Sequence, residues 1–106
     1  MTTHNTIINQ LIEAVIANDV DDVNELLHKG ADPNAYLDSA AITPLHYAAQ
    51  NDCILVIPLL IEAGADVFAQ TEPDGYTPIE IATLHGHEKV AQVLLAYGNN
   101  ADRRKH

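Results

Sequence analysis

A heptapeptide that recurs at a fixed distance limits what this chain can fold into. The sequence TPLHYAA at residues 43–49 returns 34 residues later as TPIEIAT at residues 77–83. The same spacing separates three glycines, Gly30, Gly64 and Gly98. A constant period of this length is typical of stacked repeat arrays, in which each unit contacts only its neighbours. Such arrays mostly present binding surfaces, so the period already indicates a class of function.

Each repeat of the pattern predicts two short helices. Aligning the chain on its glycines places in register the segments 9–30, 43–64 and 77–98. In the middle segment, Leu45, Ala48 and Ala49 form an apolar stripe at helical spacing. A polar break follows, and then a second apolar run covers residues 54–61. We therefore expect an inner and an outer helix in every repeat.

Local signals mark where these helices begin and where the chain turns between them. Thr43 and Thr77 each precede a proline, which predicts a threonine N-cap followed by proline as the first helical residue. The turns between the two helices carry Asn18, Asp52 and Gly86, which are the residue types that best tolerate positive φ.

The connections between repeats are polar and contain proline and glycine. We call residues 31–42 the first finger and residues 65–76 the second finger, because their Asp, Asn, Pro, Ser and Gly content predicts extended turns or hairpins. All five glycines of the chain fall at turn positions of the repeat, so we expect no phosphate-binding glycine loop.

TPLHYAAQND at residues 43–52 and GADV at residues 64–67 closely resemble the pattern of ankyrin repeats. The resemblance covers about residues 9–102. It implies an all-α solenoid, an ankyrin-repeat stack of helix-turn-helix units with hairpin-like fingers projecting at right angles. A concave face would be formed by the fingers and the inner helices. It also gives His46 a structural role, in which the ring hydrogen bonds within and between neighbouring hairpins.

On this basis the chain is a single domain, residues 1–106. Its repeats lie at approximately 7–38, 39–72 and 73–102, followed by a basic tail at 103–106. Asp22 and Glu25 occupy the slots of Val56 and Leu59, so the outward flank of the first repeat is polar, as in a capping repeat. Glu80 stands in the His46 slot and begins a closing cap. We thus expect an N-cap, one internal repeat and a C-cap.

Two features depart from the common ankyrin pattern. The glycine-to-threonine distance of 13 residues makes each finger one residue longer than usual. Pro58 falls inside the second helix of the middle repeat, where it removes a backbone donor unless it lies in the first turn. We predict that this helix begins at about Ile54 or Leu55, with a modest distortion.

Length and composition limit the location of the protein. The chain of 106 residues fits one domain. It contains no apolar run long enough to span a bilayer, and its first ten residues lack the basic and apolar regions of a secretory signal. We predict no membrane partner and a cytoplasmic location, while secretion by a signal-independent route stays open.

The charge of the chain points to one kind of partner. There are 15 acidic and 5 basic residues, for a formal net charge of −10. A body this acidic repels phosphate backbones, so we expect no nucleic-acid partner. A basic protein surface is the favoured match. The alternative is that the acidity only maintains solubility.

Few residues could carry out chemistry. Cys53 follows His46 by seven residues, yet no oxyanion donor or orienting residue is evident, and a small apolar role between helices is the simpler interpretation. His85 and His87 could hold a metal ion, but the sequence offers no third ligand at a matching spacing. We predict no catalytic, cofactor or metal site. An enzyme using Cys53, His85 and His87 is the remote alternative.

The aromatic residues are more informative than the titratable ones. Tyr36, Phe68 and Tyr76 all lie in the fingers, and aromatic side chains on projecting loops are common anchors of protein interfaces. Phe68 takes the slot of the polar Asn34, and no reason for a ring there is evident from the repeat. Either Phe68 and Tyr76 pack on each other or they contact a partner.

We therefore predict a non-enzymatic protein–protein interaction module that binds through its fingers and concave face. The predicted partner-binding residues are Tyr36, Leu37, Ser39, Ala40, Ile42, Gln50, Asn51, Phe68, Thr71, Pro73, Asp74, Tyr76, Leu84 and His85. Asp38, Asp52, Glu72 and Asp74 would supply electrostatic complementarity. An adaptor, or an inhibitor or immunity-type protein for a basic partner, is a specific form of this hypothesis. A self-associating homodimer is the alternative, and a monomer is favoured.

Overall fold

The computed structural model describes residues 3–104, with side-chain surroundings for residues 6–99. In the described part every regular secondary-structure element is a helix, and the fingers are turns and irregular segments. In chain order the helices are α1 Thr3–Ile16, α2 Val20–His28, α3 Pro44–Gln50, α4 Ile57–Glu62, α5 Pro78–Leu84 and α6 Glu88–Arg104.

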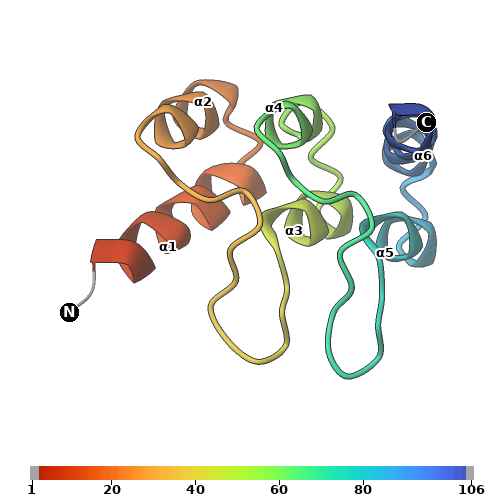
Figure 1. Cartoon of the computed structure of the whole chain (residues 1–106), viewed down its shortest axis with the longest axis horizontal. Coiled ribbons are helices and arrows are strands. Elements are labelled where there is room, and N and C mark those ends of the chain that lie inside the picture. Colours follow the sequence, from red (N-terminus) through yellow and green to blue (C-terminus); the bar gives the residue numbers. More distant parts are fainter. Residues whose placement is uncertain (1–2, 105–106) are drawn as a thin grey trace.

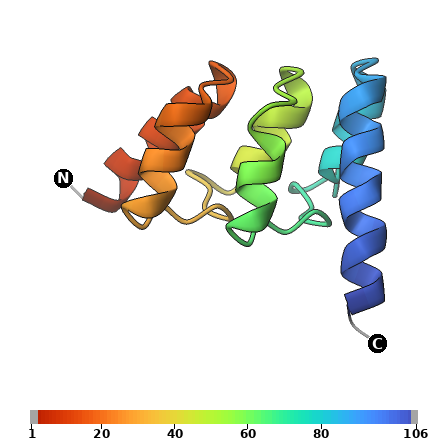
Figure 2. The ribbon, with the colours of Figure 1, turned by 90° about the horizontal axis from the view of Figure 1, so that it is seen from above.

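The helices form two parallel rows with the fingers projecting from one side. Figure 1 shows α1, α3 and α5 side by side as the inner row and α2, α4 and α6 as the outer row. Seen from above in Figure 2, the three helix pairs stand next to one another in chain order. Both fingers extend past the inner row, as the looped segments at the bottom of Figure 1. The chain is therefore an open stack of three repeats.

Small residues at the centre of the inner helices allow the repeats to approach closely. Ala48 and Ala82 are fully buried, and Ala14 nearly so, at the same slot of the three inner helices. Leu60 and Leu94 of the outer helices fill the space behind them. The core thus runs as a continuous layer through all three repeats rather than as one central cluster.

The predicted turns and caps are confirmed. Asn18, Asp52 and Gly86 have φ values of 55°, 58° and 75°, so each turns the chain in the left-handed region between its two helices. Thr43 and Thr77 are the N-caps of α3 and α5, with proline as the first helical residue in both. These signals are local, which is why the sequence reveals them.

The start of α4 corrects the sequence-based prediction. This helix begins at Ile57 rather than at Ile54 or Leu55, and residues 54–56 form a turn before it. Pro58 consequently lies in the first turn, where a helix leaves its backbone N–H groups without intrahelical partners. The helix therefore starts later than predicted, and the proline lies in its first turn.

Gly98 also departs from the expectation. Gly30 and Gly64 have positive φ values of 100° and 110° and end their helices, as the repeat predicts. Gly98, in the same slot, lies inside α6, which continues to Arg104. Two residues of the predicted basic tail, Arg103 and Arg104, therefore extend this helix, and Lys105 and His106 lie outside the described residues. In residues 3–104 no helix is long and apolar enough to cross a membrane.

Candidate binding surface

His46 holds the second finger against the middle repeat. Its Nδ1 atom accepts from the backbone N–H of Thr43 at 3.0 Å, so the ring proton resides on Nε2. That Nε2 faces the carbonyl oxygens of Ala69, at 3.0 Å, and Tyr76, at 2.9 Å. Ala69 lies in the segment that enters the second finger and Tyr76 in the segment that leaves it. One buried ring therefore connects both segments to α3. The structural role implied by the ankyrin resemblance is confirmed.

Burial lowers the pKa of His46 below its ordinary value, and the two carbonyl contacts oppose that shift only in part. The ring is therefore held neutral. Glu80 occupies the same slot in the third repeat, where its carboxylate accepts from the backbone N–H and the hydroxyl of Thr77, both at 3.0 Å. These bonds lower the pKa of Glu80. A carboxylate can only accept hydrogen bonds, so it cannot donate to finger carbonyls as His46 does. Within residues 3–104 no finger follows the third repeat, so no such donor is needed there.

Thr71 stabilises the second finger through hydrogen bonds within the finger. Its backbone N–H donates to the Tyr76 carbonyl at 3.0 Å, and its hydroxyl accepts from the Tyr76 N–H at 3.1 Å. Its carbonyl accepts from the Gly75 N–H at 2.8 Å. Thr71 is buried. Thr71 stays a predicted contact residue, but its polar groups already serve the turn and little of its surface is accessible.

The two fingers are joined to each other and to the next repeat. The backbone N–H of Glu72 donates to the carbonyl of Ala40 at 2.8 Å, which links the two fingertips. Closer to the stack, the Asn34 amide donates to the Gly64 carbonyl at 2.9 Å and accepts from the Asp66 N–H at 2.7 Å. Sequence reasoning missed Asn34 as a connecting residue. The available signal was its position, because Asn34 and Phe68 occupy equivalent positions of the two fingers, 34 residues apart.

Phe68 packs on the last helix. A Cβ atom placed on Gly98 would lie 3.3 Å from the ring Cζ of Phe68 and 3.8 Å from a methyl group of Val67. Gly98 is buried beneath this contact. The expectation that nothing in the stack requires a ring at this position was wrong, because Phe68 covers Gly98 just as Asn34 reaches Gly64. The ring still remains 43% exposed.

The other predicted contact residues are mostly accessible. Tyr36, Leu37 and Tyr76 in the fingers are 53%, 44% and 40% exposed, and Leu84 at the end of α5 is 66% exposed. Ala40 and Ile42 are half-buried. The remaining predicted residues are exposed, namely Ser39, Gln50, Asn51, Pro73, Asp74 and His85. Uncovered apolar side chains thus lie on both fingers and at the end of an inner helix.

Carboxylates lie beside these apolar residues. Asp38, Glu72 and Asp74 are exposed on the fingers, and Asp52 is exposed at the turn after α3. Asp38 accepts from the backbone N–H of Ala40 at 2.9 Å, which orders the first fingertip. Among the side chains that the structure describes, residues 6–99, no cationic group pairs with Asp38, Glu72 or Asp74. The surface is therefore both apolar and negatively charged.

The groups considered for catalysis have structural partners. The thiol of buried Cys53 lies 3.5 Å from the carbonyl of Ile16, and burial followed by the charge of Asp52 raises its pKa. In the next repeat the same slot holds His87, whose Nε2 lies 3.1 Å from the carbonyl of Gln50. Cys53 and His87 thus make equivalent contacts across successive repeats. The described side chains, residues 6–99, hold no cluster of three metal-ligating groups.

Stacked helix pairs with tethered fingers define the chain as a helical repeat solenoid built for protein–protein interaction. A family model described as ankyrin repeats, in three copies, matches residues 11–105. The chain belongs to the ankyrin-repeat family.

Three relatives illustrate the range of proteins that contain similar repeats. The chain is 37% identical to the ARF GTPase-activating protein Git of Drosophila melanogaster over 81% of its own length and 12% of the relative's. It is 42% identical to the mouse (Mus musculus) 2-5A-dependent ribonuclease, over 72% of this chain and 10% of that one. A putative ankyrin repeat protein, FPV216, of Fowlpox virus is 36% identical, over 76% of this chain and 28% of that one.

The chain spans only about a tenth to a quarter of the length of these relatives. What is shared is the repeat stack, which is typically non-catalytic, and the enzyme domains of the relatives lie outside the aligned region. Their names therefore assign this chain no reaction and no particular partner.

Proposed function

We propose that this chain binds a protein with a basic surface through its two fingers and the adjoining ends of its inner helices. The observation that carries the proposal is the set of uncovered apolar side chains on the fingers. Tyr36, Leu37 and Tyr76 are at least 40% exposed. Large apolar side chains on projecting segments are typical interface anchors, because burial against a partner removes their surface from water.

Rigidity supports the same surface. The Glu72–Ala40 backbone bond joins the fingertips, and His46 ties the second finger to α3. A surface ordered before binding loses less conformational entropy when the partner arrives. The fingers are therefore suited to rigid docking rather than to folding upon binding.

Charge sets the class of partner. Exposed carboxylates on both fingers have no ion-pair partner among the described side chains of residues 6–99, and the whole chain carries a net charge of −10. A basic protein surface would be attracted over a distance and would pair with these carboxylates on contact. With two fingers available, we expect an interface of about 800 Å² per partner or less. An inhibitor-type protein that masks such a basic surface is the specific form we favour.

The test compares two double variants that remove similar apolar surface. Tyr36→Ala with Leu37→Ala removes the anchors of the first finger, and Leu55→Ala with Leu95→Ala removes leucines that are 57% and 53% exposed outside the fingers. Partners captured from the source organism by the unaltered chain should be lost from the first variant and kept by the second. A partner retained equally by both variants would refute the first-finger assignment.

Light scattering on the purified chain addresses the alternative function. The proposal expects a monomer whose mass does not change with concentration. A homodimer that the Tyr36→Ala, Leu37→Ala variant dissociates would instead assign the fingers to self-association.

A further inference from the structure

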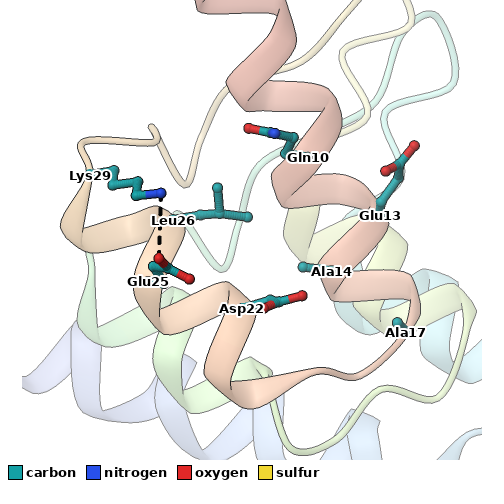
Figure 3. Close-up of a pocket in the computed structure, with 8 residues that line it drawn as sticks. All are labelled: Gln10, Glu13, Ala14, Ala17, Asp22, Glu25, Leu26 and Lys29. Carbon is teal, nitrogen blue, oxygen red and sulfur yellow. Dashed lines mark ion pairs between the residues drawn. The ribbon is translucent and has the colours of Figure 1, made fainter.

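A groove of about 340 Å³ lies between α1 and α2, in the first repeat of the stack. Figure 3 shows the groove between α1 and α2 with the rest of the stack behind it. Its floor is apolar, formed by Ala14, Ala17 and Leu26. The fingers do not contribute to its lining, so this surface is separate from the one proposed above.

Repeat symmetry shows what shape the groove accommodates. The residues equivalent to Ala14, Asp22 and Leu26, 34 positions later, are Ala48, Val56 and Leu60. All three counterparts are fully buried, because the second repeat receives the first repeat on this side. The same surface of the first repeat therefore has the backbone shape onto which helices pack.

Charge shows what kind of helix it would accept. Glu13 projects from α1, and Asp22 and Glu25 project from α2, on either side of the apolar floor (Figure 3). Lys29 is the only cation in the lining, and its ammonium lies 3.4 Å from a Glu25 carboxylate oxygen with both side chains more than 60% exposed. The lining thus contains three carboxylates and one ammonium, whereas the slots of Asp22 and Glu25 hold Val56 and Leu59 in the second repeat.

Local structure accounts for only part of this acidity. The N-terminus of α2 favours acidic residues in its first turn, which suits Asp21 and Asp22. Glu13 lies on the other helix and Glu25 lies beyond that turn, so the helix end does not explain them. The charge of Asp19, followed by burial, raises the pKa of Asp22, and Glu25 adds to the repulsion. A polar cap needed only for solubility could mix both signs of charge and avoid this crowding.

We propose that this N-terminal groove binds a cationic amphipathic helix of a protein partner. Lysine or arginine side chains would lie between Glu13, Asp22 and Glu25, and small apolar side chains would cover Ala14 and Leu26. The helix would pack on the first repeat in the way that the first repeat packs on the second. This surface is independent of the fingers, and either one can bind without the other.

The test uses a synthetic peptide and the full chain. The peptide is about 16 residues long, enough to form a helix, with Lys and Arg on one face and Leu and Ala on the other. A scrambled peptide of the same composition removes the amphipathic pattern and keeps the charge. Backbone amide resonances of the nitrogen-labelled chain report where each peptide binds, and a titration gives Kd. We expect shifts at Gln10, Ala14 and Ala17, and weaker binding of the scrambled peptide.

Matched variants separate the groove from general acidity. Asp22→Asn with Glu25→Gln should raise Kd about fivefold, whereas Glu72→Gln with Asp74→Asn, the same charge change on the second finger, should leave it nearly unchanged. Lys29→Gln should lower Kd about twofold, because Lys29 competes with the peptide for Glu25.

Three results would overturn the proposal. Equal weakening by the two double variants would mean that the peptide responds only to net charge. Shifts centred on the fingers would place the peptide on the other surface. A dimer of the chain that the Asp22→Asn, Glu25→Gln variant dissociates would assign the groove to a second copy rather than to a separate partner.

Discussion

The Nε2 atom of His46 lies 2.9 Å from the carbonyl oxygen of Tyr76, thirty residues further along the chain. This bond and its companion to Ala69 determine where the second finger stands relative to α3. The finger carries Tyr76 on its exposed surface, so the position of a predicted binding residue depends on a fully buried imidazole. The stability of the repeat and the geometry of the proposed binding surface are thus linked through one side chain.

Replacing His46 by alanine should destabilise the fold by about 2–4 kcal/mol, because it leaves buried hydrogen-bonding groups unpaired and opens a cavity. Urea denaturation followed by circular dichroism measures the change. Glu80→Ala, in the same slot but exposed, is the matched control and should cost clearly less. Equal losses in the two variants would mean that the bridge to the second finger adds nothing to stability.

Stability should also fall as the pH drops below about 6.5, the ordinary pKa of a histidine. Burial lowers the pKa of His46 in the folded state, so the unfolded chain binds a proton that the folded chain resists. The contribution of the neutral ring is complete above 6.5 and is lost as the pH falls toward the lower folded pKa. Urea midpoints measured from pH 8 to pH 5 test this. The slope of the urea midpoint against pH should be smaller in the His46→Gln variant. An unchanged slope would exclude His46 as the source of the pH dependence.

Asn34 should contribute to the stability of the fold through its two hydrogen bonds to the second repeat, at Gly64 and Asp66. Asn34→Ala should lower the free energy of unfolding by about 1–2 kcal/mol, with each exposed bond supplying a modest share. Asn24→Ala, on the exposed face of α2, is the control and should change stability little. Thermal unfolding of both variants is sufficient, and equal melting temperatures would contradict the connecting role of Asn34.

Phe68 and Gly98 should be energetically coupled. Alanine at position 98 would favour the helix by up to about 1 kcal/mol, but its Cβ would approach the Phe68 ring. Gly98→Ala should therefore stabilise the Phe68→Ala background more than the unaltered chain. A double-mutant cycle by urea unfolding should give a coupling energy of about 0.5–1 kcal/mol. Additive effects would mean that the ring moves aside freely.

Association with the partner should slow steeply as salt is added. Screening reduces the long-range attraction between the acidic chain and a basic surface, while the dissociation rate depends mainly on the apolar contacts. Stopped-flow or surface-based kinetics at several sodium chloride concentrations separate the two rates. An association rate that does not respond to salt would count against electrostatic steering.

Much of the architecture was predictable from local signals. The Thr-Pro helix starts at Thr43 and Thr77 and the positive φ at Asn18 and Asp52 depend on neighbouring residues alone, and the 34-residue period can be read directly along the sequence. The candidate surface was less predictable. The exposure of Tyr36 and Leu37 agrees with their assignment to a finger, whereas Thr71 faces inward because its groups close the turn with Tyr76.

The sequence by itself determined the repeat, the two helices of each unit, their caps and the excess of negative charge, because these follow from periodicity and from the backbone preferences of individual residues. Only the tertiary structure decided that Phe68 covers Gly98, that Ala41 adopts a positive φ of 55° in the first finger, and that α1 and α2 enclose an acidic groove. The contact of Phe68 with Gly98 depends on which residues meet across repeats, and the groove depends on how two helices pack, so neither has a local signal in the chain.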